Sequence, residues 1–277
     1  MFSNCERFGS NFLCGASVRY LLHQTCTALY EASKNRSIWL NFCQGYLVPS
    51  VTSPQLLHPE RPLWKYNSQE LEFLFLRLQG AEIGLRGDDN PPARSRRVDT
   101  TNRAVRMHLV EGGRWLLVMS KTGFVTYVDL DSPTITEAIL ISDQIDAPSP
   151  VVEMEIVIDM DRSSSFLAFN IAFSFCSFGH IRDPKEHKIQ VWHVDLVLDE
   201  QQLGIGLTCK QVATFPLEAE IYLLYALSLV GPHVAFSVRC VGYIQLVKTF
   251  VVDWDRANGK SNYPRRLIHP VEEPLVR

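Results

Sequence analysis

The chain has 277 residues, of which 46% are hydrophobic and 21% charged, so it can bury a substantial core as one or two domains. Its formal net charge of −3 gives no overall attraction to nucleic acid or to an anionic membrane, and we predict that it binds neither. Partners must therefore be recognised by local surfaces.

The seven cysteines are scattered and never form a Cys-x-x-Cys pair, which argues against a zinc site or a disulfide framework. Buried free thiols in a reducing compartment fit this spacing better. Polar residues interrupt the apolar stretch that a secretory signal would need between Met1 and Gly15. We predict an intracellular protein, cytoplasmic or nuclear, that uses no metal or other cofactor.

The segment from Val18 to Leu40 has the pattern of two helices joined by one turn. Apolar or small residues recur at helical spacing from Val18 to Ala32, which predicts an amphipathic helix. Asn35 suits a left-handed helix stop, and Ser37 suits the N-cap of a brief second helix. Two arbitrary helices of an α-helical cap would show the same pattern.

This segment resembles the second half of an F-box, in which a Thr-Cys-x-x-Leu-Tyr stretch is followed by a Ser-x-Trp turn. The match covers residues 16–43, and the chain resembles a fungal F-box protein with a C-terminal degenerate WD-repeat region. The first half of the motif, a Leu-Pro-x-Glu-Leu-Leu helix, has no counterpart in residues 1–15, so we expect a truncated F-box. The resemblance implies a substrate receptor of a cullin (SCF-type) ubiquitin ligase. It also implies that the Skp adaptor would contact Cys26, Leu29, Tyr30 and Trp39.

Residues 46–104 are predicted to be a linker that follows the helical segment of residues 1–45. A helix is expected near residues 68–79, opened by a capping box of Asn67 and Glu70 and closed by Gly80. The glycine, proline and arginine content of residues 84–104 predicts a domain boundary. Its arginines could bind acidic or phosphorylated partners, although a solvated hinge explains the same composition.

Residues 105–277 read as β structure, with short runs rich in valine, leucine and aromatic residues between turn residues. Ile221 to Val238 is apolar, but Gly231 and Pro232 divide it, so two strands fit better than a membrane span. The predicted strands form three trios: Val105 to Val110, Trp115 to Ser120 and Phe124 to Leu130; Val151 to Ile158, Phe166 to Cys176 and Ile189 to Leu196; Tyr222 to Leu229, His233 to Arg239 and Ile244 to Trp254.

The trios recur with a period of about 50 to 65 residues, which is typical of β-propeller blades. Each trio ends in a valine followed by an aspartate that can accept hydrogen bonds from the next turn: Asp129, Asp195 and Asp253. Trp115, Trp192 and Trp254 are expected to anchor the blades. The predicted fold is mainly β with an α-helical N-terminal part, and it contains about three blades. We expect either a truncated product or an open stack of sheets with exposed edges.

No compact catalytic motif occurs in the sequence, so we predict a protein-binding protein and not an enzyme. The alternative is a propeller enzyme or small-ligand binder that uses acidic and histidine side chains. The side chains that strand alternation could bring together for such chemistry are Glu153, Glu155, His187, His193 and Asp195. A solvated strand face accounts for the same residues. The identity of a target protein does not follow from the sequence.

Overall fold

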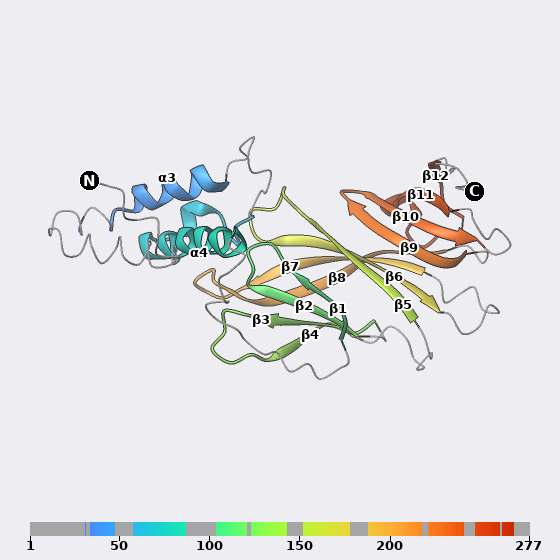
Figure 1. Cartoon of the computed structure of the whole chain (residues 1–277), viewed down its shortest axis with the longest axis horizontal. Coiled ribbons are helices and arrows are strands. Elements are labelled where there is room, and N and C mark those ends of the chain that lie inside the picture. Colours follow the sequence, from blue (N-terminus) through green and yellow to red (C-terminus); the bar gives the residue numbers. More distant parts are fainter. Residues whose placement is uncertain are drawn as a thin grey trace. The chain divides into compact units, whose positions relative to one another are not determined.

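The computed structural model describes residues 31, 34–47, 58–86, 104–120, 123–142, 152–177, 188–217, 221–240, 247–260 and 262–268. The chain divides into two compact units, Met1–Val98 and Asp99–Arg277. In Figure 1 the labelled elements of the first unit are helices, and those of the second unit are strands. No helix within the described ranges is long and apolar enough to cross a membrane.

The helical unit contains α3 (Arg36–Leu47), a short 3-10 helix η1 (Leu63–Lys65) and α4 (Ser68–Arg86). The amide nitrogen of Ser37 donates to Asn35 Oδ1 over 3.0 Å, and the Ser37 hydroxyl lies 2.8 Å from the same oxygen. Asn35 therefore caps α3. The expected N-cap at Ser37 is wrong, and α3 is not brief, since it runs for 12 residues.

The expected left-handed stop at Asn35 is also wrong. Gln202 is the only non-glycine residue with a positive φ in the described parts of the chain. Asn35 instead caps the start of α3 with its side-chain oxygen. Asparagine is favoured both at helix N-caps and in the left-handed conformation after a helix, so its presence alone does not decide between the two. The amphipathic helix predicted from Val18 to Ala32 lies outside the described residues, apart from Glu31, which is helical.

The capping box at the start of α4 is confirmed. The Glu70 amide donates to Asn67 Oδ1 over 3.0 Å, and the Asn67 amide donates to Glu70 Oε2 over 2.7 Å. The expected end at Gly80 is wrong, because α4 continues to Arg86. Gly80 lacks the positive φ of a helix-ending glycine, and one glycine inside a helix costs only about 1 kcal/mol relative to alanine.

The second unit is built from three four-stranded antiparallel sheets in the described residues, each in chain order. The first sheet contains β1 (Ala104–Leu109), β2 (Trp115–Ser120), β3 (Val125–Asp129) and β4 (Glu137–Ile141). The second contains β5 (Val152–Met160), β6 (Ala168–Ser177), β7 (Lys188–Leu198) and β8 (Gly204–Pro216). The third contains β9 (Ile221–Val230), β10 (His233–Cys240), β11 (Val247–Asp253) and β12 (Arg265–Ile268).

Every predicted strand is present, and the fold class is confirmed as mainly β with propeller-like sheets. The fourth strand of each sheet was not predicted. The last predicted strand also ends one residue too late, because Trp254 begins a helical turn, α5 (Trp254–Ala257). Asp253 is its N-cap and accepts a hydrogen bond from the Arg256 amide over 3.2 Å.

The β5–β8 sheet lies between the other two sheets (Figure 1). Because strand side chains alternate, Phe169 and Phe173 face the β1–β4 sheet, whereas Ala172 faces the β9–β12 sheet. The first strands of the sheets follow one another, with β1 against β5 and β5 against β9. This order resembles that of the inner strands in successive propeller blades, so the described strands form three propeller-like sheets.

The three tryptophans predicted to anchor the blades differ in burial. Trp115 is buried in the core between the first two sheets, while Trp192 packs against that core from a partly buried position. Trp254 is partly buried against the core of the second and third sheets. All three therefore contribute to the cores between sheets.

Candidate functional site

An aromatic cluster follows the seam between α3 and α4. Trp39, Phe42 and Tyr46 recur every three or four residues, which places them on one face of α3. The Phe42 ring stacks on Phe75 of α4 with 5.2 Å between ring centroids. Trp39 lies 6.2 Å from Phe75, and Tyr46 meets its edge at 6.1 Å. We call Trp39, Phe42, Tyr46 and Phe75 the aromatic seam.

The aromatic seam contains an exposed ring, and the residue next to that ring in α3 is buried. Cys43 is buried at its base, where Sγ lies 3.4 Å from the carbonyl oxygen of Leu71, and burial raises the pKa of this thiol. Phe42 is half exposed, with 50% of its surface accessible. Elsewhere in the unit, Phe73 and Trp64 are 65% and 72% exposed. Large exposed aromatic side chains are the residues that protein interfaces use as anchors.

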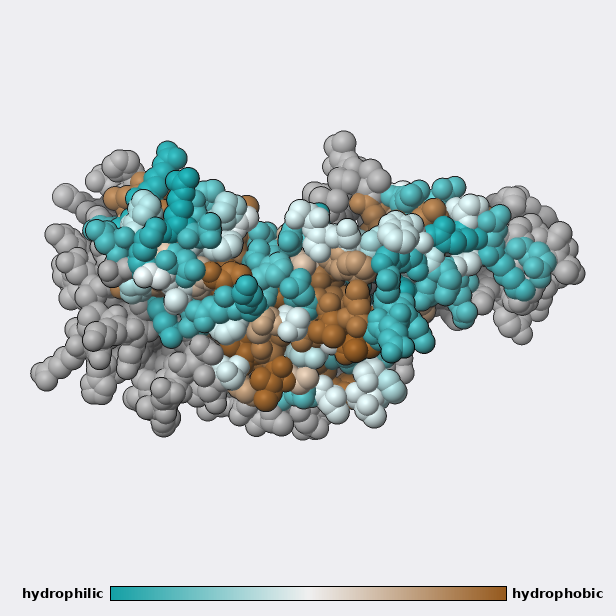
Figure 2. Space-filling view, turned by 180° about the vertical axis from the view of Figure 1, so that it is seen from behind, coloured by the Kyte–Doolittle hydropathy of each residue, from teal (hydrophilic) through white to brown (hydrophobic). Residues whose placement is uncertain are grey.

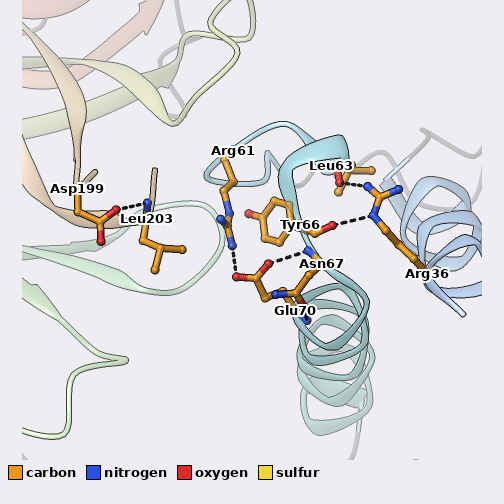
Figure 3. Close-up of polar contacts among 8 residues, drawn as sticks. All are labelled: Arg36, Arg61, Leu63, Tyr66, Asn67, Glu70, Asp199 and Leu203. Atoms are coloured by element: carbon orange, nitrogen blue, oxygen red, sulfur yellow. Dashed lines mark hydrogen bonds and ion pairs between the residues drawn. The ribbon is translucent and has the colours of Figure 1, made fainter. Parts of the chain in front are cut away.

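A polar network holds the start of α4 against the start of α3 (Figure 3). Arg36 donates to the carbonyl oxygens of Tyr66, over 2.8 Å, and Leu63, over 3.1 Å. Arg61 pairs with Glu70 at 2.6 Å, and its guanidinium lies 4.2 Å from the centre of the Tyr66 ring. Burial, followed by the negative charge of Glu60, raises the pKa of the Tyr66 hydroxyl. The network fixes the two helices so that the seam has a defined shape.

Of the predicted adaptor-binding residues, Trp39 lies in the aromatic seam. Cys26, Leu29 and Tyr30 lie outside the described residues. Sequence reasoning missed Phe42 and Phe75. Phe42 follows Trp39 by three residues, and this helical spacing could have placed both on one face of α3. The contact of Phe42 with Phe75 could not be predicted in this way, because it depends on how α3 packs against α4.

In the β unit, the aspartates at strand ends only partly follow the prediction. Asp129 Oδ1 accepts from the Asp131 amide over 2.9 Å, and Asp253 caps α5 as described above. Asp195 does not contact a turn, because β7 continues to Leu198. Asp199 takes that role, since its Oδ1 accepts from the Leu203 amide over 2.7 Å (Figure 3).

The structure brings two of the five candidate catalytic residues together. His193 Nε2 lies 3.2 Å from Asp195 Oδ1, and His193 Nδ1 lies 2.9 Å from Asn170 Oδ1. Both residues of the pair come from β7, and Asp195 is 58% exposed. Glu155 is engaged elsewhere, in an ion pair with Arg106 at 3.0 Å. The side chain of Glu153 and all of His187 lie outside the described residues.

Polar contacts tie together the turns at one end of the three blades. Arg162, in the β5–β6 turn, pairs with Glu111, in the β1–β2 turn, at 3.0 Å. Asp159 Oδ2 at the end of β5 accepts from the amide of Gly231, in the β9–β10 turn, over 2.6 Å. The Trp254 indole donates to the Gly231 carbonyl over 2.9 Å. The turn between the first two strands of each sheet is thus linked by a polar contact to a neighbouring sheet.

Hydrophobic areas also interrupt the hydrophilic surface in the view of Figure 2. In the β unit the exposed apolar side chains include Met107 and Leu109 of β1 and Ile139 of β4. Their positions in the register place all three on the face of the first sheet that points away from the second. At the centre of that face, however, Val118 and Val128 are buried.

No protein-family model matches the chain, and neither a curated protein nor a solved structure matches it. The resemblance to F-box and WD-repeat proteins therefore depends on the sequence motifs alone, and it stays a prediction.

Proposed function

We propose that this chain is a protein–protein interaction adaptor of the F-box type, a substrate receptor of a cullin ubiquitin ligase. Its helical unit binds a Skp-type adaptor, and its β unit binds a target protein. The observation that carries the proposal is the aromatic seam, where Phe42 is half exposed although it stacks on Phe75.

The seam suits a binding surface for two physical reasons. An exposed aromatic ring buries a large apolar area when a partner covers it, at a cost of few rotatable bonds. Phe42 is also held in place before binding by Trp39 and Phe75, so little side-chain entropy remains to be lost. The choice of a Skp-type adaptor as the partner comes from the F-box resemblance of residues 16–43.

Binding of the purified full chain to a purified Skp-type adaptor, measured by titration calorimetry, tests the proposal. We expect micromolar or tighter binding, and we expect Phe42→Ala to weaken it at least about tenfold, as truncation of an interface anchor does. Asn41→Ala is the matched control, because Asn41 is the neighbouring exposed residue of α3. Two results would contradict the proposal: no binding at 100 µM, a concentration that corresponds to a binding free energy of about −5.5 kcal/mol, or equal binding by the Phe42→Ala variant.

A propeller enzyme is the second candidate, and the pair of His193 and Asp195 supports it. A carboxylate that orients an imidazole is a common arrangement for a general base. The pair is open to solvent on a strand face, and Asn170 occupies the other ring nitrogen. A hydrolytic activity that is lost in His193→Ala and retained in Lys188→Ala would favour this candidate over the adaptor, since Lys188 lies at the start of β7 on the opposite face of the strand.

A further inference from the structure

The outer edge of β8 is covered by a turn from the third sheet. β8 pairs with β7 along one side, as the last strand of its sheet. On its other side, Thr214 donates its amide to Asn258 Oδ1 over 3.1 Å and accepts at its carbonyl from the Gly259 amide over 2.9 Å. The carbonyl of Val212 accepts from Asn258 Nδ2 over 3.0 Å. Three backbone groups of the edge are therefore satisfied.

The Asn258 side chain replaces a neighbouring strand in these contacts. A carboxamide offers one acceptor and a donor, as a peptide group does, so it can bind a strand edge as another strand would. The turn is fixed from within by the Asn258 amide, which donates to the Trp254 carbonyl over 3.0 Å. Gly259 has a φ of +68°, a conformation that glycine adopts without strain.

The covered part of β8, residues 212–215, carries no charge. Residues 212–215 read Val-Ala-Thr-Phe, which have high β-propensity apart from the alanine, and an exposed edge of that kind can pair with another chain. The preceding part of the strand carries the exposed Lys210, and lysine on an edge opposes such pairing. The turn thus covers an uncharged segment of the β8 edge.

We propose that Asn258 and Gly259 form a built-in cap that prevents β8 from pairing with β8 of a second copy of this chain. Two identical strands pair antiparallel across a two-fold axis, so the same segment on each copy supplies both edges. With the cap removed, the Val212 and Thr214 backbone groups would bond to a second copy and extend the sheet across the dimer.

The test compares Asn258→Ala with the wild-type full chain, with Lys260→Ala as the control in the same exposed segment. Hydrogen exchange at the Thr214 amide should accelerate about tenfold in dilute samples of Asn258→Ala, because one hydrogen bond is lost. Sedimentation velocity over a range of concentrations should show a dimer whose dissociation constant is at least about tenfold lower than that of the wild type. Lys260→Ala should match the wild type in both measurements.

A second substitution makes the result specific to the β8 edge. Adding Thr214→Lys to Asn258→Ala places a charge on the exposed edge and should abolish the dimer. If Asn258→Ala does not fold, Asn258→Leu supplies the same measurements, since leucine has nearly the shape of asparagine but can neither accept from the Thr214 amide nor donate to the Val212 carbonyl. A variant that folds and stays monomeric at every concentration, or a dimer that survives Thr214→Lys, would overturn the proposal.

Discussion

The two units use aromatic side chains in opposite ways. In the β unit the largest side chains are completely buried between sheets, among them Trp115, Phe169, Phe173, Phe215 and Phe236. In the helical unit Phe42, Phe73 and Trp64 are half or more exposed. Burial of an aromatic ring stabilises a fold, whereas an exposed ring held in a fixed position is available to a partner. Aromatic residues should therefore control stability in the β unit and binding in the helical unit.

The largest expected effect is that of Trp115→Ala. Trp115 is buried between the first two sheets, where Arg114 covers its ring at 4.4 Å and Tyr127 meets it edge to face at 5.6 Å. Its removal should lower the free energy of unfolding by about 3–5 kcal/mol, as large-to-small core substitutions do. Urea denaturation monitored by circular dichroism measures this, and a loss below about 1 kcal/mol would show that the ring is not part of the core.

A smaller effect is expected from Gly206→Ala in β8. A Cβ atom at Gly206 would lie 2.8 Å from the Tyr127 hydroxyl oxygen, so the partly buried Tyr127 side chain would have to shift to make room for it. We expect a loss of about 1–3 kcal/mol in the free energy of unfolding. Tyr127→Phe removes the clashing oxygen, and the double variant should regain much of that loss. Additive losses in thermal or urea unfolding would show that this contact does not limit the packing.

The ion pair of Arg114 and Asp129 should make stability depend on pH. Burial alone would raise the pKa of Asp129, but hydrogen bonds from Arg114 and from the Asp131 amide outweigh it and hold the pKa below its usual range. A carboxylate with a lowered folded-state pKa stabilises the protein above its unfolded pKa of about 4, and this contribution disappears as the pH falls through the folded value.

Asp129→Asn should therefore be less stable than the wild type at pH 7, by about 1–2 kcal/mol. The difference should shrink as the pH is lowered from about 5 to about 2, since the wild-type carboxylate becomes protonated. Urea denaturation of both proteins across this pH range measures it. A difference that stays constant down to pH 2 would mean that the charge of Asp129 contributes nothing.

The smallest effect on stability is expected from Phe42→Ala. Its ring contacts Trp39 and Phe75 but is half exposed, so truncation should cost less than about 1 kcal/mol. Thermal unfolding of the full chain should thus change little, although adaptor binding is expected to weaken at least about tenfold. A cost comparable to that of Trp115→Ala would show that Phe42 is a core residue and would remove the contrast between the two units.

The sequence was most informative where local chemistry decides the structure. Asn67 and Glu70 form the predicted capping box because their bonds need only a short stretch of chain. The strands with regular apolar patterns were found for the same reason. β8 was missed because Gly204, Gly206 and the Lys210–Gln211 pair interrupt its pattern, and pairing with β7 makes it a strand.

Long-range contacts explain what could not be predicted of the candidate sites. Phe75 faces Phe42 only because α3 and α4 pack together, and the residues are far apart in sequence. The role expected of Asp195 belongs to Asp199, because β7 extends beyond the predicted end and the turn begins later. The contact of Asn258 with β8 likewise joins two different sheets.

Hydrogen exchange of the full chain with and without a Skp-type adaptor tests the division between the two units most directly. We predict slower exchange of the amides of α3 and the first turns of α4 when the adaptor is added, and unchanged exchange in β5 to β8. The Phe42→Ala variant should show clearly less protection at the same concentrations. Protection confined to the strands, or no protection with adaptor at saturating concentration, would contradict the assignment of the helical unit as the adaptor-binding part.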